Sequence, residues 1–270
     1  MASTQSTHVP KSELPYPPIH KDAKFVVLSD SDGTITSFDS NGKLFHLTDN
    51  YGFGNQRRRE LNIETLEGKA TFRDAFREML ASIPLSFEEC TEILKRDIKL
   101  DPGFAEFYAW CKAQSIPVVI VSSGMAPLIR AVLSNLIGEE DASQIDIISN
   151  DVKIHENGKW EIAYRHPESG FGHDKSQAIL PYRTLNPTPT LFFFGDGVSD
   201  MSAAQHADVL FIKLNENGES DLAKYCDKVG IKNIKIQNFG QALPIVQNVV
   251  DGAISVTEAL EIGNVIGTQG

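Results

Sequence analysis

Short runs of apolar residues recur along the chain, separated by longer stretches of mixed character. Runs of this length are typical of strands buried on both faces of a parallel sheet. Helix-like stretches lie between several of them, as at Phe104–Lys112 and Pro127–Leu136. This alternation predicts an α/β fold, in which a Rossmann-like parallel sheet carries helices on both faces. The runs that predict the strands are Phe25–Leu28, Val118–Val121, Ile145–Ile148, Leu191–Phe194 and Val209–Ile212.

The first two runs are about 90 residues apart, whereas a crossover between parallel strands needs only a dozen or more. Within this interval Phe72, Phe76, Met79 and Leu80 repeat at helical spacing, and a second helical pattern follows them. The spacing predicts a small helical domain inserted after the first strand. The predicted domains are a core over 21–38 and 101–270 and a helical domain over 39–100.

The later part of the chain adds a hairpin and further alternation. Two alternating segments flank a turn signal, Glu156-Asn157-Gly158, and together predict a β-hairpin over Asp151–Tyr164. Beyond the last strand of the core, the pattern predicts a helix over Asp221–Val229, a strand near Ile234–Ile236, and helices to about residue 262.

Composition and charge narrow the functions that the fold can serve. Hydrophobic residues make up 41% of the 270 residues and no apolar run approaches a membrane span, so we expect a soluble chain. The formal charge of −11 argues against nucleic acid and anionic membranes as partners, because both need a basic face. Residues 1–20 are rich in Ser, Thr and Pro and lack a secretion signal, which predicts a flexible tail. Three scattered cysteines favour reduced thiols in the cytoplasm.

The most informative polar residues follow the first predicted strand. Asp30 and Asp32 stand two apart in Leu28-Ser29-Asp30-Ser31-Asp32-Gly33-Thr34, at the carboxyl end where open α/β sheets bind their ligands. Two carboxylates placed in this way can divide phosphoryl transfer between them. One attacks phosphorus as nucleophile, and the other delivers a proton to the departing alkoxide. We therefore assign attack to Asp30 and proton transfer to Asp32.

Two further fragments offer groups that bind a phosphate. Ser122, Ser123 and Gly124 come directly after the second buried run, where a hydroxyl and backbone N–H groups near a helix N-terminus can donate to phosphoryl oxygens. Lys175 opens a predicted helix after the polar loop Gly172-His173-Asp174, and its ammonium is a compact charge for neutralising phosphate. The sequence therefore predicts Ser122 and Lys175 as catalytic residues beside the two acids.

A second pair of acids follows the run Leu191–Phe194. Asp196 and Asp200 lie in Gly195-Asp196-Gly197-Val198-Ser199-Asp200, at what we expect to be the same edge of the sheet. Magnesium prefers oxygen ligands and usually keeps several waters. The pattern predicts a Mg²⁺ site formed by Asp30, the backbone carbonyl of Asp32, and Asp196, with Asp200 positioning a water or Lys175.

At this point the sequence resembles the haloacid dehalogenase superfamily. The resemblance rests on Asp30-Ser31-Asp32-Gly33-Thr34, Ser122, Lys175 and Gly195-Asp196-Gly197-Val198-Ser199-Asp200. It implies an aspartyl-phosphate intermediate at Asp30, and Asp32 two residues later implies a phosphatase or mutase. The inserted helical domain is similar to the cap that closes over substrate in phosphoserine phosphatases.

A narrower resemblance is to fungal sugar-alcohol phosphate phosphatases. It rests on five segments, and it implies a polyol or sugar phosphate as substrate. We expect the substrate to be bound mainly by the cap, through Asp49, Asn50 and Arg73, with His173 near the entrance. Ser31 departs from the aromatic residue usual in these relatives, but it points away from the two acids and we expect little effect. The segments are Thr48–Gly54, Phe72-Arg73, Leu100–Phe104, Val121–Met125 and Phe171–Ser176.

Other interpretations of the same residues stay open. Arg73 can equally form a surface ion pair with Asp74 or Glu78. A phosphomutase or a phosphoserine phosphatase would use the same acids, and a binding module without turnover would be expected to lack Asp30, Asp32 or Lys175, all of which are present. The sequence predicts a small phosphorylated metabolite as partner and leaves the oligomeric state open.

Overall fold

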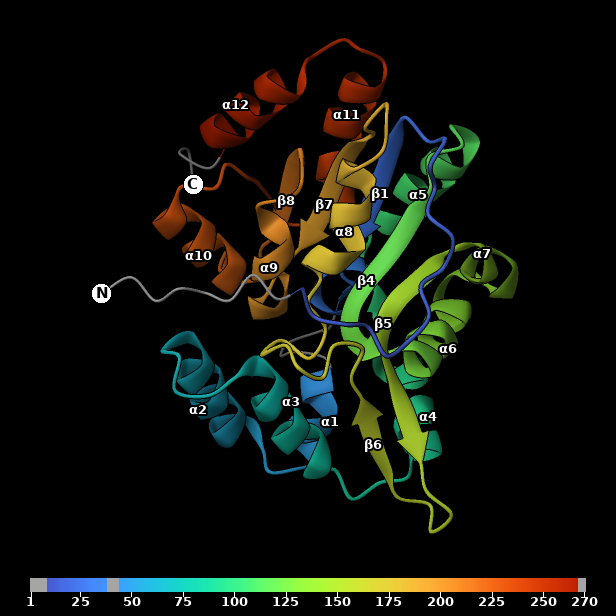
Figure 1. Cartoon of the computed structure of the whole chain (residues 1–270), viewed down its shortest axis with the longest axis vertical. Helices are drawn as coiled ribbons and strands as arrows, with labels where there is room; N and C mark the ends of the chain where they lie inside the picture. Colours follow the sequence, from blue (N-terminus) through green and yellow to red (C-terminus); the bar gives the residue numbers. More distant parts are fainter. Residues whose placement is uncertain (1–8, 38–43, 267–270) are drawn as a thin grey trace.

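The computed structural model describes residues 9–37 and 44–266 (Figure 1). The remaining residues are 1–8, 38–43 and 267–270. The first part of the predicted tail and the predicted start of the helical insertion at residue 39 therefore lie outside the described residues.

A mostly parallel sheet forms the centre of the molecule. Within the described residues its seven strands lie in the order β6-β5-β4-β1-β7-β8-β9, and the five predicted apolar runs supply the middle of it. Neighbouring strands pair in parallel except β5 and β6, which form the predicted hairpin. The predicted α/β fold class is confirmed. The strands are β1 Phe25–Ser29, β4 Val118–Met125, β5 Asp146–Ile154, β6 Trp160–Ala163, β7 Thr190–Gly195, β8 Val209–Lys213 and β9 Ile234–Ile236.

Helices cover both faces of the sheet because alternate residues of the strands point to opposite sides. Phe192 and Phe194 of β7 join one buried cluster, whereas Leu191 and Phe193 join another. Among the described helices, none is both long and apolar enough to cross a membrane. The first face carries α5 Phe104–Ala113, α6 Ala126–Ile137, α7 Glu139–Gln144, α11 Phe239–Val250 and α12 Val256–Ile266, and the second carries α8 Ser176–Arg183, α9 Met201–Ala204 and α10 Asp221–Val229.

Four further helices lie toward the carboxyl ends of the strands, and the last of them, α4, also packs against α6 of the core (Figure 1). Their apolar side chains form a third buried cluster, in which Phe76, Met79 and Leu80 meet Ile162 and Tyr164 from the hairpin and the residue after it. Side-chain caps fix two of the helix starts, Thr71 before α3 and a capping box at Ser86 before α4. The helices are α1 Leu44–Tyr51, α2 Asn55–Leu66, α3 Phe72–Ala81 and α4 Phe87–Asp97.

Two neighbouring linkers join this helical unit to the sheet. The outgoing linker β2 (Thr36–Ser37) pairs antiparallel with the returning linker β3 (Lys99–Leu100). Behind them the buried Lys213 Nζ lies 2.5 Å from Asp101 Oδ2 and donates to the carbonyl of Thr34 at 2.8 Å. This one ammonium therefore holds the chain on both sides of the helical unit.

The N-terminal segment, residues 9–20, belongs to the predicted flexible tail and is hydrogen-bonded to the core. It forms no helix or strand, and the N–H of Glu13 donates to the carbonyl of Arg165 at 2.8 Å. The Arg165 guanidinium in turn donates to the carbonyls of Leu14 and Pro15, at 3.0 and 3.1 Å. The described part of the predicted tail is therefore held by backbone hydrogen bonds that its Ser-, Thr- and Pro-rich composition does not reveal.

Candidate active site

The predicted nucleophile lies at the carboxyl end of the central strand β1. Its backbone N–H donates to the carbonyl of Phe194 on β7, which fixes Asp30 between two strands. The Asp30 carboxylate accepts from the N–H of Ser31 at 2.7 Å, and the residue is 5% exposed. Asp30 is therefore oriented by its own turn (Ser31–Ile35) and almost enclosed by the protein.

Lys175, at the start of α8, provides a buried cation beside it. Lys175 Nζ lies 3.0 Å from Asp30 Oδ1 and 2.6 Å from Asp200 Oδ1, and the side chain is fully buried. Burial acts to lower the pKa of Lys175, but the carboxylates of Asp200 and Asp30 outweigh it and raise that pKa above its ordinary value. Lys175 is therefore an ammonium held between two acids.

Asp200 also fixes the loop that follows β7. Its second oxygen, Oδ2, accepts from the N–H groups of Asp196 and Gly197, each at 3.0 Å. Burial raises the pKa of Asp200 to about 6, while the charge of Lys175 acts in the opposite direction. One carboxylate therefore holds both the ammonium and the turn that carries Asp196, and the predicted role of Asp200, positioning a water or Lys175, stays a prediction.

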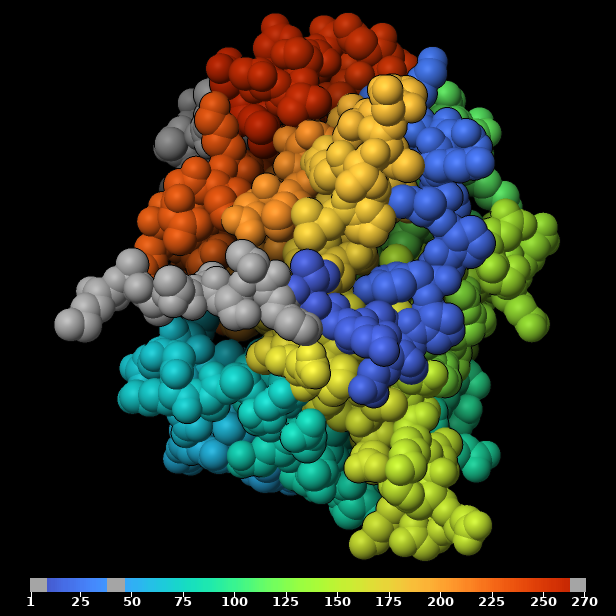
Figure 2. All heavy atoms as spheres, in the orientation of Figure 1, coloured from blue at the N-terminus to red at the C-terminus, as the bar shows by residue number. Residues whose placement is uncertain are grey.

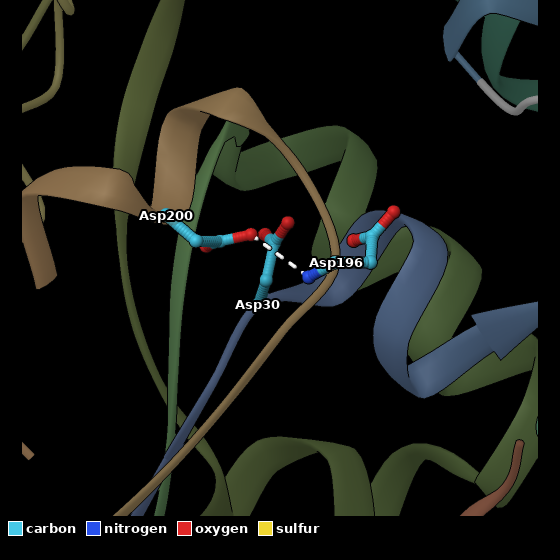
Figure 3. A group of neighbouring side chains, drawn as sticks. All are labelled: Asp30, Asp196 and Asp200. Atoms are coloured by element: carbon cyan, nitrogen blue, oxygen red, sulfur yellow. Dashed lines mark hydrogen bonds between the residues drawn. The ribbon is translucent and has the colours of Figure 1, made fainter. Parts of the chain in front are cut away.

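Three carboxylates meet at this point. Asp30, Asp196 and Asp200 each offer an oxygen, and these atoms all lie within 4.8 Å of one another (Figure 3). The set fits Mg²⁺, because it consists of hard oxygen donors and carries more negative charge than the ammonium of Lys175 offsets. The side chain of Asp32 is not part of this group. Its predicted role in the metal site, through the backbone carbonyl, stays a prediction.

Two hydroxyl groups support Asp196, and the sequence did not single out either of them for this role. Thr34 Oγ1 donates to Asp196 Oδ1 at 3.0 Å, and Ser220 Oγ donates to the Asp196 carbonyl at 2.7 Å. Thr34 belongs to the first motif. Ser220 caps α10, and its only signal in the sequence is a serine directly before a predicted helix.

Ser122, Ser123 and Gly124 lie within a strand, whereas the sequence placed them after one. β4 continues to Met125, with a shift in its pairing to β5 between Ser122 and Met125, and α6 begins only at Ala126. Ser122 Oγ accepts from the N–H of Gly124 at 3.1 Å, so its own proton can be donated. α6 therefore begins one residue before the predicted start at Pro127, and Ser122 lies four residues ahead of it, inside the strand.

His173 is fully buried, so its predicted place near the entrance is wrong. Its Nδ1 lies 2.8 Å from the carbonyl of Ser122 and must donate, because a carbonyl oxygen only accepts. Burial keeps the pKa of His173 well below its ordinary value, so the ring is neutral. The residue supports the Ser122 backbone from behind.

Two of the predicted cap residues, Asp49 and Arg73, have partners within the helical unit or at its edge. The Asp49 carboxylate binds Arg58 Nε at 2.9 Å and also accepts from Asn55. Arg73 Nε donates to Asp74 at 2.9 Å, as the ion-pair interpretation predicted, and the same guanidinium donates to the carbonyl of Pro167. Asn50 is exposed on α1. No contact described for these side chains reaches the three carboxylates, and their role in substrate binding stays a prediction.

Gly33 allows a test of the acidic group. A Cβ at Gly33 would lie 2.1 Å from Asp196 Oδ2, and its φ of +89° is already unfavourable for other residues. We expect Gly33→Ala to displace the Asp196 carboxylate and weaken Mg²⁺ binding roughly tenfold or more, measured by titration calorimetry.

Gly68→Ala is the matched control for Gly33→Ala. Gly68 has a φ of +72°, but nothing lies within 4 Å of the position its Cβ would take. The substitution strains the backbone without touching Asp196, so Mg²⁺ affinity should not change. Equal affinities for the wild-type protein and Gly33→Ala would show that Asp196 is not a ligand.

Comparisons with known proteins agree with this geometry. The chain is 48% identical to Pdp3-interacting factor 1 of Schizosaccharomyces pombe, over 79% of this chain and 90% of that protein. It is 41% identical to polyol phosphate phosphatase PYP1 of Saccharomyces cerevisiae, over 88% of this chain and 99% of that protein. The fold resembles phosphoserine phosphatase from T. onnurineus, with a TM-score of 0.53, 18% identity, and coverage of 78% of this chain and 97% of that one.

The family follows from a match over most of the chain. A model of haloacid dehalogenase-like hydrolases matches residues 27–205, a range that contains Asp30, Ser122, Lys175, Asp196 and Asp200. The resemblance inferred from the sequence is thereby confirmed, and the chain belongs to the haloacid dehalogenase-like hydrolases.

Proposed function

We propose that this chain is a magnesium-dependent phosphatase that hydrolyses the phosphate ester of a small sugar alcohol or sugar. The observation that carries the proposal is the Asp30 carboxylate, 3.0 Å from the buried Lys175 ammonium and grouped with Asp196 and Asp200. The substrate class is supported by 41% identity to a polyol phosphate phosphatase, along 99% of that protein.

In the first half-reaction, an Asp30 oxygen attacks phosphorus in line with the ester oxygen, and the bond to the leaving alkoxide breaks. Asp32 gives its proton to that alkoxide, which departs as an alcohol. The ammonium of Lys175 and the hydroxyl of Ser122 offset the charge on the phosphoryl oxygens. The phosphoryl group is then held on Asp30 as an aspartyl-phosphate.

In the second half-reaction, water replaces Asp30 at phosphorus. Asp32, now deprotonated, takes a proton from that water, which attacks phosphorus and releases the Asp30 carboxylate together with inorganic phosphate. Mg²⁺ held by Asp30, Asp196 and the carbonyl of Asp32 would supply positive charge close to the phosphoryl oxygens. Asp200 keeps Lys175 and the Asp196 turn in place through both steps.

We assign substrate selection to the helical unit, α1–α4, acting as a cap. It lies toward the carboxyl ends of the strands, and the paired linkers β2 and β3 join it to the core (Figure 1). A cap at this edge excludes water from the reacting phosphate and contacts the part of the substrate that varies between esters. Asp49, Asn50 and Arg73 remain our proposed contacts from this unit, whereas His173 supports the Ser122 backbone from within the core.

The test is phosphate release from a panel of esters in the presence of Mg²⁺. The panel contains sugar-alcohol phosphates, sugar phosphates, glycerol phosphate and phosphoserine. We expect the highest kcat/KM for the sugar-alcohol esters, and loss of turnover in EDTA that added Mg²⁺ restores.

Other outcomes assign the chain differently. A preference for phosphoserine would replace the proposed substrate class, and dependence on a bisphosphate activator would identify a phosphomutase. If no ester releases phosphate while the protein still binds Mg²⁺, the chain is a binding module.

A further inference from the structure

The last three residues of one loop, His173, Asp174 and Lys175, connect that loop to the candidate active site. This loop, residues 164–175 between β6 and α8, is called the Lys175 loop below. His173 Nδ1 donates to the carbonyl of Ser122 at 2.8 Å, and Lys175 binds Asp30 and Asp200. Between them the backbone N–H of Asp174 donates to His166 Nδ1 at 3.1 Å. His166 therefore holds the centre of the segment whose two ends contact the residues proposed to act on phosphate.

The hydrogen bond from Asp174 also determines where the His166 proton lies. Because Nδ1 accepts, the proton of the neutral ring is on Nε2, which lies 2.9 Å from the hydroxyl of Tyr16. His166 is fully buried, and burial lowers its pKa to about 4. The Tyr16 hydroxyl, from the N-terminal segment, therefore accepts from His166 Nε2, while His166 Nδ1 accepts from the backbone N–H of Asp174.

Arg165, the residue before His166, fixes the same segment to the sheet. Its guanidinium binds the carbonyls of Leu14 and Pro15, and its Nε donates to the carbonyl of Ser149 on β5 at 2.9 Å. The cationic carbon lies 4.7 Å from the centre of the Tyr16 ring, close enough for a cation–π contact. Figure 2 shows the darkest blue part of the chain lying across the yellow residues that follow the hairpin.

From these contacts we infer that Tyr16 and His166 are positioning residues for the proposed phosphatase reaction. The N-terminal segment, through Tyr16 and the backbone groups that bind Arg165, sets the position of His166. His166 sets the position of Asp174 and thereby of Lys175. The inference rests on the proposed function for its effect on rate, but the ordering of the Lys175 loop by Tyr16 does not depend on it.

The reason for an effect on kcat is geometric. Lys175 and Ser122 are proposed to stabilise the charge that develops on the phosphoryl group in the transition state. A small displacement of these two side chains therefore lowers the reaction rate more than it weakens substrate binding. We expect His166→Leu to lower kcat by roughly ten- to a hundredfold, with a change in KM of less than about threefold. His166→Asn places Oδ1 where Nδ1 accepts from Asp174, and it should recover most of the lost rate.

Tyr16→Phe tests the N-terminal segment separately. It keeps the ring over Arg165 and removes the hydroxyl, so we expect amide exchange in residues 164–175 to rise roughly fivefold, the worth of about one hydrogen bond. We expect kcat to fall by about the same factor.

The control is Tyr108→Phe, which removes a hydroxyl that donates to the carbonyl of Asp141 at 3.2 Å, on a helix away from this loop. It should leave both the amide exchange of residues 164–175 and kcat at wild-type values.

Three outcomes would overturn the inference. Two of them are unchanged amide exchange in Tyr16→Phe, and faster amide exchange with unchanged kcat. The third is a His166→Asn variant as slow as His166→Leu. If the wild-type protein releases no phosphate, the proposed function fails, and the exchange data still decide whether Tyr16 orders the loop.

Discussion

Asp30→Asn should reduce phosphate release by about 10⁴-fold or more, because the amide keeps the shape of the side chain but cannot attack phosphorus. The fold should persist, since the amide oxygen can still accept from the N–H of Ser31, a bond of 2.7 Å in the wild-type protein. The measurement is single-turnover phosphate release with Mg²⁺ present, beside thermal unfolding of the same preparation.

Asp251→Asn is the matched control for Asp30→Asn. Asp251 is exposed at the end of α11, so the same chemical change there should leave turnover at the wild-type rate. If Asp30→Asn retains turnover above a tenth of the wild-type rate, another group attacks phosphorus and our assignment of the nucleophile is wrong.

Of the substitutions proposed at the acidic group, Lys175→Met should lower the free energy of unfolding the most. Methionine resembles lysine in length but leaves Asp30 and Asp200 without their shared cation, and breaking a buried ion pair on one side costs about 3–5 kcal/mol. We expect the free energy of unfolding in urea to fall by this amount without metal. Mg²⁺ should then stabilise Lys175→Met more than the wild-type protein, because a divalent cation offsets the same carboxylates.

Lys213→Met serves as the control for Lys175→Met. It removes another buried ammonium from its partner, Asp101, so it should also be destabilising. Mg²⁺ should stabilise Lys213→Met no more than the wild-type protein. Equal gains from Mg²⁺ in Lys175→Met and Lys213→Met would show that Lys175 is not coupled to the acidic group.

The sequence predicted the sheet well because buried parallel strands are nearly continuous apolar runs. Leu191–Phe194, for example, is the centre of β7, and the acids that follow it lie where the end of that strand places them. The order of polar fragments along the chain was enough to bring Asp30, Lys175, Asp196 and Asp200 together, since the carboxyl ends of parallel strands share one edge.

The sequence did not predict features that depend on contacts between distant segments. The N-terminal segment has no periodic pattern, and its order depends on Arg165, about 150 residues further along the chain. His173 lies in a polar loop and was expected near the entrance, yet it is fully buried and its Nδ1 donates to the carbonyl of Ser122. Asp49 looks like a substrate ligand by residue type, and only the fold reveals its ion pair with Arg58. For Arg73, the sequence already offered the ion pair with Asp74 as an alternative.

The pairing of β2 with β3 has a consequence for engineering. The chain leaves the sheet through β2 and returns through β3, and these two strands pair antiparallel. The two ends of any segment inserted between Ser37 and Lys99 therefore have to be only as far apart as two neighbouring strands. We therefore expect that helical units from relatives with different substrates can be exchanged at Ser37 and Lys99 where the packing of α4 against α6 is kept. Lys213 and Asp101 lie on the sheet side of both junctions, so a chimaera built in this way retains their ion pair.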